Sequence, residues 1–446
     1  MLNAKSSGSF RIVVAGGGAG GLELITRLGK RLGRRPGVTL TLIDQNPAHL
    51  WKPLLHEVAA GTLNSNEDEL GYLAHAHWHH FQFHLGRLAA LDRTRKVLAI
   101  AATVDDDGQE YLPRRELPYD CLVVAIGSVT NDFQIQGVAE HCWFLDSRAQ
   151  ADSFHLRLLH ACYAANAQAA PLREGQLHVA IAGAGATGVE LAAELHHAVR
   201  ALIRYGLDRI NPERDIRIHL IDASARILPG LSPEIARAAQ RALESLSITV
   251  HTGEVITAAT ATGLHTKSGK TIPAEIKVWA AGIKGSDVLA KLDGLEVNRA
   301  GQLVVRATLQ TTVDENIYAF GDCAACPMHD GTASVPPRAQ AAHQQAKLLA
   351  RILANRSFGR DSGLVFRYRD FGSLINLSVH NTVGNLMGNL FGRQAGAIGI
   401  EGWFARLAYL SLYKLHQITV QGVIRTALMT LANILTRSAK PRLKLH

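Results

Sequence analysis

The sequence predicts an α/β protein with two similar sheet-and-helix domains and a C-terminal amphipathic helical segment. Three observations indicate this fold. The 446 residues suffice for two or three domains of ordinary size. A glycine-rich turn that joins an apolar run to a helical pattern occurs twice, 167 positions apart. Finally, 47% of the residues are hydrophobic and 19% are charged, a balance that excludes an intrinsically disordered chain.

The two glycine-rich turns share one pattern, GxGxxG. The first follows the apolar run 11–15 and the second follows the run 178–182, and each opens a helical segment. Glycines at these spacings let the backbone approach a pyrophosphate, while the N-terminus of the helix supplies amide groups and a positive dipole. The turns therefore predict two Rossmann-type dinucleotide-binding domains, whose cofactor-binding glycines are Gly16, Gly18, Gly21, Gly183, Gly185 and Gly188.

An aspartate ends the second strand-like run of each predicted domain. Asp44 follows the run 39–43 and Asp222 follows the run 217–221. A carboxylate at this position can accept hydrogen bonds from ribose hydroxyls, and at Asp222 it favours NADH because it would repel the 2′-phosphate of NADPH. The nearby Arg226 leaves NADPH open. The alternative interpretation is that both aspartates are helix caps in ordinary α/β turns.

A third motif lies far downstream, where a short strand-like run ends in Gly321-Asp322. These residues resemble the FAD signature of flavoproteins that bind two dinucleotides, in which the aspartate holds the ribityl chain. The order then predicts an FAD-binding domain interrupted by an NADH-binding domain. We expect four segments: 1–165 and 285–365 for the two halves of the FAD domain, 166–284 for the NADH domain, and 366–446 for a C-terminal membrane-anchoring domain.

The cysteines narrow the choice among flavoproteins with this organisation. Disulfide reductases need a redox pair soon after the first turn, yet residues 44–70 contain no cysteine. Sulfide:quinone reductases need cysteines that flank the flavin, and no cysteine follows Cys326 to pair with Cys162. The remaining pair, Cys323 and Cys326, follows the Gly-Asp motif, and we interpret it as small residues that start a helix away from the flavin ring rather than as a redox pair.

Several further segments point to one family. They are 51–61 (WKPLLHEVAAG), 125–128 with 131–133, 278–283 (VWAAGI) and 335–345 (VPPRAQAAHQQ), the last of which carries an AQxxxQ pattern. With the two turns, these segments make the chain resemble, nearly end to end, a type II NADH dehydrogenase, the non-proton-pumping NADH:quinone oxidoreductase. The resemblance implies non-covalent FAD, NADH as substrate, two-electron reduction of a membrane quinone in a respiratory chain, and no metal.

The resemblance also implies roles for individual residues. Hydride would pass from NADH to the flavin, with Glu190 near both rings; a helix residue without such a role is the alternative, since Glu23 has the same place in the first copy. Gln340 and Gln344, four apart on one helix face, would contact the quinone together with Pro336 and Pro337, unless they form a solvated polar face. The cofactor-binding residues implied in this way also include Lys52, Pro53, Gly127, Ala281 and Gly282. Lys52-Pro53 is expected to start a helix.

Five histidines between positions 75 and 84 invite a metal interpretation. His75 with His79, and His80 with His84, have the spacing of neighbours on a helix face. Because no convergent partner ligands are identified, we interpret them as surface or structural residues.

The formal charge of +9 is mostly local. Residues 403–446 contain seven basic and no acidic side chains, whereas the rest of the chain carries only +2. Here an aromatic segment, 403–415, precedes an amphipathic pattern after Gly422, and no apolar run is long enough to span a bilayer. We therefore expect a helix that lies on an anionic lipid surface rather than a nucleic-acid site, with the protein peripheral on the cytoplasmic face of a bacterial-type inner membrane. Packing against the chain's own body is the alternative, and the resemblance suggests a homodimer.

Two other functions share the two glycine turns. One is a soluble-type FAD reductase that passes electrons from NADH to a small redox protein, which would need neither the AQxxxQ segment nor the basic tail. The other is an NAD-sensing peripheral membrane protein that has retained flavin. Reduction of the flavin by NADH, and its reoxidation by a quinone, would separate the three.

Overall fold

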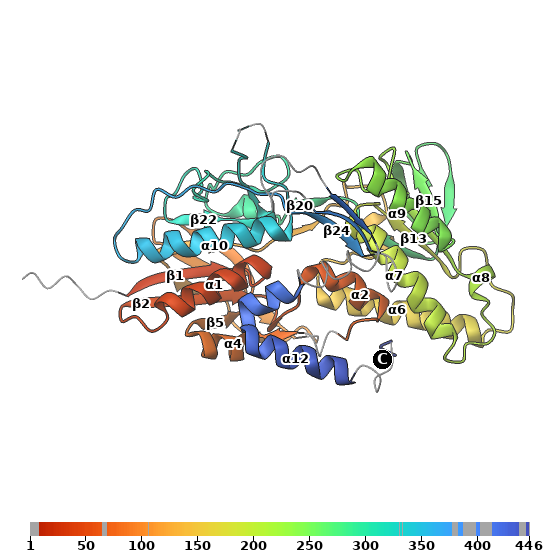
Figure 1. Cartoon of the computed structure of the whole chain (residues 1–446), viewed down its shortest axis with the longest axis horizontal. Coiled ribbons are helices and arrows are strands. Elements are labelled where there is room, and N and C mark those ends of the chain that lie inside the picture. Colours follow the sequence, from red (N-terminus) through yellow and green to blue (C-terminus); the bar gives the residue numbers. More distant parts are fainter. Residues whose placement is uncertain are drawn as a thin grey trace, which may run out of the picture. The chain divides into compact units, whose positions relative to one another are not determined.

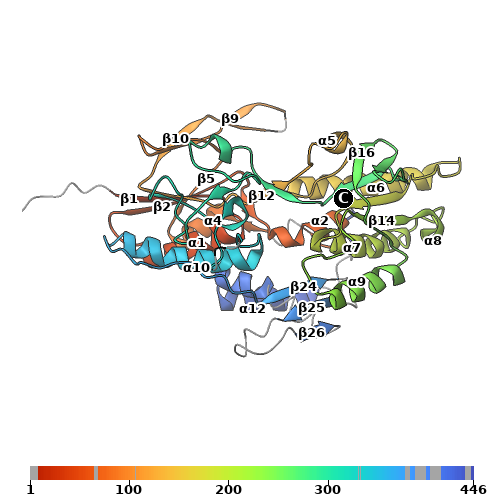
Figure 2. The ribbon, with the colours of Figure 1, turned by 90° about the horizontal axis from the view of Figure 1, so that it is seen from above.

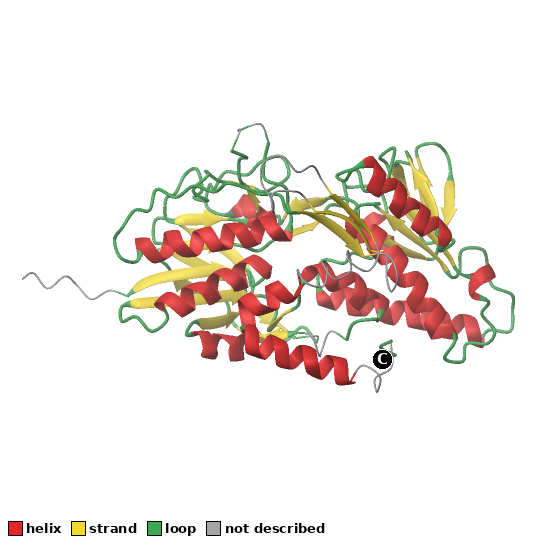
Figure 3. Cartoon of the chain, viewed as in Figure 1, coloured by secondary structure: helices red, strands yellow, loops and turns green. Residues whose placement is uncertain are grey.

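The protein is described by a computed structural model over residues 9–64, 69–105, 107–329, 331, 333–376, 382–386, 398–401, 413–436 and 443–445. The chain forms two compact units, and each is described by itself. The first comprises Met1–Trp51, Glu69–Val129 and Ile283–Arg369; the second comprises Lys52–Asp68, Thr130–Gly282 and Asp370–His446. Both contain a parallel sheet and helices (Figures 1 and 3), which confirms the predicted α/β class. The four predicted segment boundaries stay predictions.

The first unit is built on a five-stranded sheet in the order β22-β11-β1-β2-β5, with every pair parallel. Its strands are β1 (Phe10–Ala15), β2 (Val38–Asp44), β5 (Gln82–Leu85), β11 (Cys121–Val124) and β22 (Ile317–Ala319). Strand β11 is buried along its whole length and β1 over its last four residues, as expected for a parallel sheet covered on both faces. A second, antiparallel sheet contains β6 (Leu88–Asp92), β7 (Val97–Ile100) and β10 (Arg115–Pro118).

Three helices of the first unit matter for function: α1 (Ala19–Leu32), α4 (Tyr72–His79) and α10 (Ala339–Arg356). Helices α1 and α10 lie side by side (Figures 1 and 2). Gly20 permits this packing, because a Cβ there would press on the Phe320 ring and on Ala342 of α10. The helix that begins at the first glycine turn therefore packs directly against the helix that carries the AQxxxQ segment.

The second unit has a four-stranded parallel sheet in the order β15-β14-β13-β19. Its strands are β13 (His178–Ala182), β14 (Arg217–Asp222), β15 (Thr249–Thr252) and β19 (Ile276–Trp279). Before its C-terminal part, this unit contains the helices α2 (Leu55–Ala60), α5 (Val138–His141), α6 (Arg148–Ala167), α7 (Ala186–Ile203), α8 (Pro212–Asp215) and α9 (Pro233–Ser245). It also contains an antiparallel sheet of β16 (Ile256–Thr260), β17 (Gly263–Thr266) and β18 (Thr271–Pro273). A buried apolar cluster between the two sheets includes Ala182, Leu264 and Trp279.

The C-terminal part begins with a sheet that the sequence analysis missed. Strands β24 (Gly372–Asn376), β25 (Thr382–Leu386) and β26 (Ile398–Glu401) pair antiparallel. Their asparagines and glycines weaken any alternating apolar pattern, so periodicity gave no strand signal. A helix over 413–421 and α12 (Val423–Thr436) follow, in agreement with the predicted helical segment. Within the described part of the chain, every helix is too short or too polar to cross a bilayer.

Helix α12 exposes the apolar side that the sequence predicted. Ile424, Leu428, Leu431 and Leu435 are exposed, Ile424 by 78%, whereas Thr426 on the other side is buried. The aromatic segment from Trp403 to Leu412, with its basic residue Arg406, lies outside the described residues, as do the basic residues Arg437, Lys440 and Arg442.

The chain end does not offer all of its basic groups to solvent. The backbone N–H of Lys444 donates to the carbonyl of Gly61, and its Nζ lies 3.1 Å from Asp152 Oδ1. The Lys444 ammonium is thus paired with a carboxylate of α6 in its own unit.

Candidate functional site

Each of the three glycines in the first glycine turn is required for a different structural reason. Gly16 has a φ of +106°, and a Cβ there would collide with the backbone of Ala125. A Cβ on Gly21 would collide with the carbonyl oxygen of Gly16, so this glycine seats α1 against the turn. Gly18 has no atom within 4 Å of a Cβ position. The outer glycines thus form the turn, and the middle one leaves the open space that a pyrophosphate needs.

Asp44 holds this turn in place. The register of β1 and β2 pairs Ala15 with Ile43, so the residues that follow, Gly16 and Asp44, come together at the carboxyl ends of the strands. The N–H of Gly17 donates to Asp44 Oδ2 at 2.6 Å. Burial raises the pKa of Asp44, and the hydrogen bonds from Asn46 and Gly17 oppose that rise. Asp44 therefore orients the turn and is not a helix cap.

Two residues that were not predicted from the sequence contact the carbonyl oxygen of Gly17. The hydroxyl of Tyr72 donates to the carbonyl of Gly17 at 2.6 Å, and His49 Nδ1 lies 3.1 Å from the same oxygen. Burial raises the pKa of Tyr72 well above its usual value, so the phenol remains a donor. No spacing in the sequence points to them, because Tyr72 lies 55 residues from Gly17.

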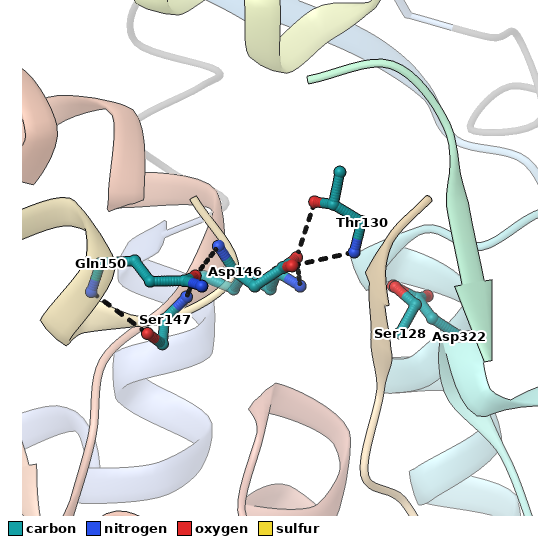
Figure 4. A network of polar contacts seen from close by, with 7 residues as sticks. Ser128, Thr130, Asp146, Ser147, Gln150 and Asp322 are labelled. Atoms are coloured by element: carbon teal, nitrogen blue, oxygen red, sulfur yellow. Dashed lines mark hydrogen bonds and ion pairs between the residues drawn. The ribbon is translucent and has the colours of Figure 1, made fainter. Parts of the chain in front are cut away.

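The other predicted FAD residues lie at the carboxyl ends of neighbouring strands of the same sheet. Gly127, with a φ of +72°, follows β11, and Gly321-Asp322 follows β22. Ser128 Oγ donates to Asp322 Oδ2 at 3.3 Å (Figure 4). Ligands of open parallel sheets bind beyond the carboxyl ends of the strands, so Gly18, Asp44, Gly127 and Asp322 fit one extended dinucleotide.

Two glutamines hold the backbone of the Gly321-Asp322 motif by hydrogen bonds. Gln345 lies on the buried side of α10, and its Oε1 accepts a hydrogen bond of 2.9 Å from the N–H of Gly321. Gln302 Nε2 donates to the carbonyl of Asp322. Neither glutamine has a role that its position in the sequence indicates. Gln345 directly follows the predicted quinone residue Gln344, and only its burial distinguishes the two.

The second glycine turn repeats the first almost atom for atom. Gly183 has a φ of +103°, a Cβ on Gly188 would collide with the carbonyl oxygen of Gly183, and Gly185 has nothing within 4 Å. The N–H of Ala184 donates to Asp222 Oδ2 at 2.6 Å, and the N–H of Ser224 donates to Oδ1 at 2.7 Å. This turn also fits a dinucleotide, and Asp222, like Asp44, is not a helix cap.

Ala281 and Gly282 follow β19 on the same edge of the second unit's sheet. Gly282 has a φ of +73°, and a Cβ there would meet the ring of Phe133. Trp279 Nε1 donates to the carbonyl of Asn131 at 2.8 Å, which fixes the segment before Phe133 beside this turn. Segments 131–133 and 278–283, which are separate parts of the family resemblance, therefore contact each other in the fold.

Glu190 lies in the first turns of α7 and is 93% buried. Its Oε2 is 3.8 Å from Nδ1 of His56 on α2, a residue without a predicted role. Burial lowers the pKa of His56 to about 4, so the imidazole is neutral near pH 7. Among the described residues, His56 Nε2 has no hydrogen-bond partner although it is buried, which leaves a donor or acceptor available to a ligand.

Lys52 and Pro53 form a 3-10 turn, Lys52–Leu54, that leads into α2, as expected. Lys52 Nζ lies 3.3 Å from Asp146 Oδ1. Asp146 also accepts hydrogen bonds from the N–H and the hydroxyl of Thr130, and its own N–H donates to Gln150 (Figure 4). This network fixes the start of α6, which Ser147 and Gln150 cap reciprocally.

Gln340 and Gln344 both lie in the first turns of α10, one helical turn apart, with Pro336 and Pro337 just before the helix. Both polar atoms of the Gln344 side-chain amide bond within the first unit: Oε1 accepts from the N–H of Arg369, and Nε2 donates to the Arg369 carbonyl at 2.8 Å. Gln344 thus fastens the chain near residue 369 to α10, which the spacing alone did not indicate.

The prediction that Cys323 and Cys326 start a helix is wrong. Gly321–Cys323 is a 3-10 turn, and Ala324–Ala325 is strand β23. Both thiols are free and fully buried. Burial raises the pKa of Cys323 to about 12 and that of Cys326 to about 11. Neither cysteine has the low pKa of a reactive thiol.

These pKa values predict slow alkylation of the native protein. At pH 8 the thiolate fraction of either cysteine is roughly 10⁻³ or less, so iodoacetamide should leave both unmodified while labelling all five cysteines after denaturation. Intact-mass measurement over an hour checks this. Rapid native labelling at Cys323 or Cys326 would restore the redox interpretation.

The histidine run divides between a core and a surface. His75 is buried with its Nε2 2.8 Å from Thr26 Oγ1, and its ring centroid lies 4.2 Å from that of His79 on the same helix. His80 caps the C-terminus of α4 and His84 lies in β5, so these two histidines do not share a helix face. In the described ranges, no group of three or more His, Cys, Asp or Glu residues is arranged to hold a metal ion.

Comparisons with known proteins agree with this geometry. Residues 10–346 match the family model described as pyridine nucleotide-disulphide oxidoreductase. A type II NADH:quinone oxidoreductase of Haemophilus influenzae is 42% identical, over 98% of this chain and 99% of its own. One of Mycobacterium tuberculosis is 29% identical, over 92% and 84%.

Among solved structures, NDH2 of Plasmodium falciparum in complex with NADH matches with a TM-score of 0.80 at 18% identity, covering 98% of this chain and 100% of that one. The sulfide:quinone oxidoreductase of Aquifex aeolicus matches with a TM-score of 0.70 at 17% identity, covering 93% and 92%. At such identities the likeness concerns the fold.

Proposed function

Because this chain belongs to the type II NADH:quinone oxidoreductase family, we propose that it oxidises NADH and reduces a membrane quinone by two electrons, without proton pumping, in a respiratory chain. One observation supports this most: two glycine turns of the same construction, each fastened by an aspartate at the carboxyl edge of its own parallel sheet. When bound, FAD would supply the redox chemistry, which is hydride transfer from NADH and two-electron reduction of the quinone.

The chain's own residues bind and orient these molecules. In the first unit, the amides at the start of α1 and the space at Gly18 would hold the FAD pyrophosphate, and Asp322, kept in place by Gln302 and Gln345, would hold the ribityl chain. In the second unit, the turn at Gly185 would hold NADH. The Asp222 carboxylate disfavours a 2′-phosphate, so NADH is the expected donor.

Glu190 and His56 are the polar pair proposed to orient the reacting rings. Neutral His56 cannot hold the Glu190 carboxylate by charge, and 3.8 Å exceeds hydrogen-bond length. We propose that Glu190 Oε2 holds or moves a proton beside the reacting rings, and that the buried Nε2 of His56 offers a polar contact to the bound ligand. For the quinone we propose Gln340, Pro336 and Pro337 as contacts, with Gln344 as a positioning residue through its clasp on Arg369.

Anaerobic mixing of the FAD-loaded protein with NADH or NADPH tests the proposal. NADH should bleach the flavin absorbance within seconds, and NADPH should do so much more slowly. A short-chain quinone added next should restore oxidised flavin repeatedly under excess NADH. Failure of NADH to bleach the flavin would remove every reductase function, whereas bleaching without reoxidation by quinone would favour a protein acceptor.

The exposed apolar side of α12 is proposed to bury itself in the lipid interface. Removing residues 403–446 would also remove the Lys444 contacts with Gly61 and Asp152, so substitution is the cleaner test. A variant with Leu428, Leu431 and Leu435 replaced by Gln should lose most of its binding to vesicles. A control with exposed Val104, Val313 and Val365 replaced by Gln should keep it; equal binding of both variants would contradict the anchor. The homodimer and the cytoplasmic face stay predictions.

A further inference from the structure

A cluster of cationic side chains lies where α1 ends in the first unit. Lys30, Arg31, Arg34 and Arg35 fall within six positions, and no acidic residue interrupts them. They line a pocket of about 350 Å³ together with Gly29, Trp78, His79 and His80. None of the described residues that line this pocket is acidic. The pocket thus concentrates positive potential, although the chain outside its C-terminal tail is nearly neutral.

Gly29 near the end of α1 and Gly33, which caps that helix, bring the end of α4 into this cluster. Gly29 and Gly33 are one helical turn apart, and a Cβ on either would collide with the backbone carbonyl of His79 or His80. The end of α4 therefore rests directly on α1. Arg34 Nε donates to His80 Nε2 at 2.9 Å, which ties one guanidinium to the residue that caps α4. The position of the pocket is a consequence of close backbone packing, not of flexible side chains alone.

The exposed side of α4 brings one large apolar group, Trp78, to the lining of the pocket and carries a second, Leu73, outside that lining. Leu73 is 72% exposed and Trp78 is 48% exposed, while Tyr72 and His75 occupy the buried side of the same helix. Tryptophan beside lysine and arginine is the combination found at membrane interfaces, where the ring lies at headgroup level and the cations reach phosphates. A free phosphate would explain the cations but not the two exposed apolar side chains.

We propose that this pocket binds the phosphate headgroup of an anionic phospholipid, with Trp78 and Leu73 against the acyl boundary. The inference goes beyond the proposed reaction and is independent of the α12 anchor, which belongs to the other unit. An alternative function for the cations is to complement the negative dipoles at the C-termini of α1 and α4. That role predicts an effect on stability and none on lipid binding.

Vesicle binding by the full-length, FAD-loaded protein distinguishes these roles. The patch variant replaces Lys30, Arg31 and Arg34 by Gln; Arg35 is kept because it packs 3.6 Å over the Phe358 ring. The matched control replaces Arg114, Arg299 and Arg360, three exposed cations of the same unit, by Gln. Partitioning is compared on phosphatidylcholine vesicles with and without 30% phosphatidylglycerol, roughly a physiological anionic content.

We expect the patch variant to lose at least about tenfold in partitioning on anionic vesicles, since each cation near the surface contributes about fivefold. Its partitioning on neutral vesicles should not change, and the control should lose far less. Equal losses in the two variants, or a melting temperature lowered in the patch variant with unchanged partitioning, would overturn the proposal. Should the triple variant fail to fold, Arg31→Gln alone should still lose a few-fold.

Two further measurements identify the ligand. Fluorescence quenching by brominated lipid should decrease in Trp78→Phe relative to the unaltered protein, because this indole is placed at the lipid boundary. Inorganic phosphate, added at constant ionic strength, should compete only weakly with anionic vesicles. The patch variant could lose tight phosphate binding and yet keep its vesicle binding. That result would assign the pocket to free phosphate and overturn the proposal of a lipid ligand.

Discussion

A Gly185→Ala variant should fold and retain FAD but bind NADH at least about tenfold more weakly, a loss of about 1.4 kcal/mol. No atom lies within 4 Å of a Cβ at Gly185, and its φ of −73° suits any L residue, so the substitution costs the second unit little. The added methyl group would instead fill the space through which a pyrophosphate approaches the first amides of α7. The KM for NADH and the melting temperature are the quantities to measure.

Two other glycines provide controls for this experiment. Gly71→Ala adds a Cβ in open space in the first unit, outside either turn, and should change neither KM nor stability. Gly188→Ala forces a Cβ against the Gly183 carbonyl and should destabilise the second unit by about 2 kcal/mol or more. If Gly185→Ala left the KM for NADH unchanged, the nucleotide would not lie on this turn.

Glu190→Gln should lower the turnover of NADH with quinone about 10²-fold, within the range for loss of a general acid or base. The amide keeps the shape of the carboxyl group but cannot carry its charge or accept a proton. Because Glu190 is buried beside neutral His56, the surrounding packing should tolerate this change. Stopped-flow bleaching of the flavin and the charge-transfer absorbance after NADH addition report the effect directly.

Glu194→Gln is the matched control, because it makes the same chemical change one turn further along α7. It should leave turnover within about twofold of the unaltered protein. A Glu190→Gln protein with normal turnover and normal charge-transfer absorbance would show that Glu190 is only a helix residue. Equal losses in both variants would instead indicate a general effect on α7.

The two nucleotide turns could be predicted from the sequence because every part of them is local. A buried strand, three glycines and the start of a helix follow one another without interruption, and the aspartate ends the next strand. Parallel pairing of Ala15 with Ile43, and of Ala182 with Ile221, then makes the contact between turn and aspartate unavoidable. The amphipathic side of α12 was predictable for the same reason, since a single helix sets which side chains share a face.

Other parts of the site depend on residues that are distant in the sequence. Tyr72 reaches Gly17 across 55 positions, Gln345 holds Gly321 across 24, and His56 meets Glu190 from a different helix. Their spacing carries no periodic signal, so only the packed structure identifies them. The antiparallel sheet β24-β25-β26 was missed because its glycines and asparagines hide the alternation that marks a strand.

The sequence by itself therefore determined the fold class, the two nucleotide turns with their aspartates, and the family resemblance, because each follows from short-range geometry or from contiguous motifs. The tertiary structure decided which side chains hold those turns in place, that Gln344 fastens residue 369, and that Lys444 pairs within its own unit. It also gathered four cations, an indole and two histidines into one pocket. Burial and side-chain direction decide such contacts, and they exist only once the chain has packed.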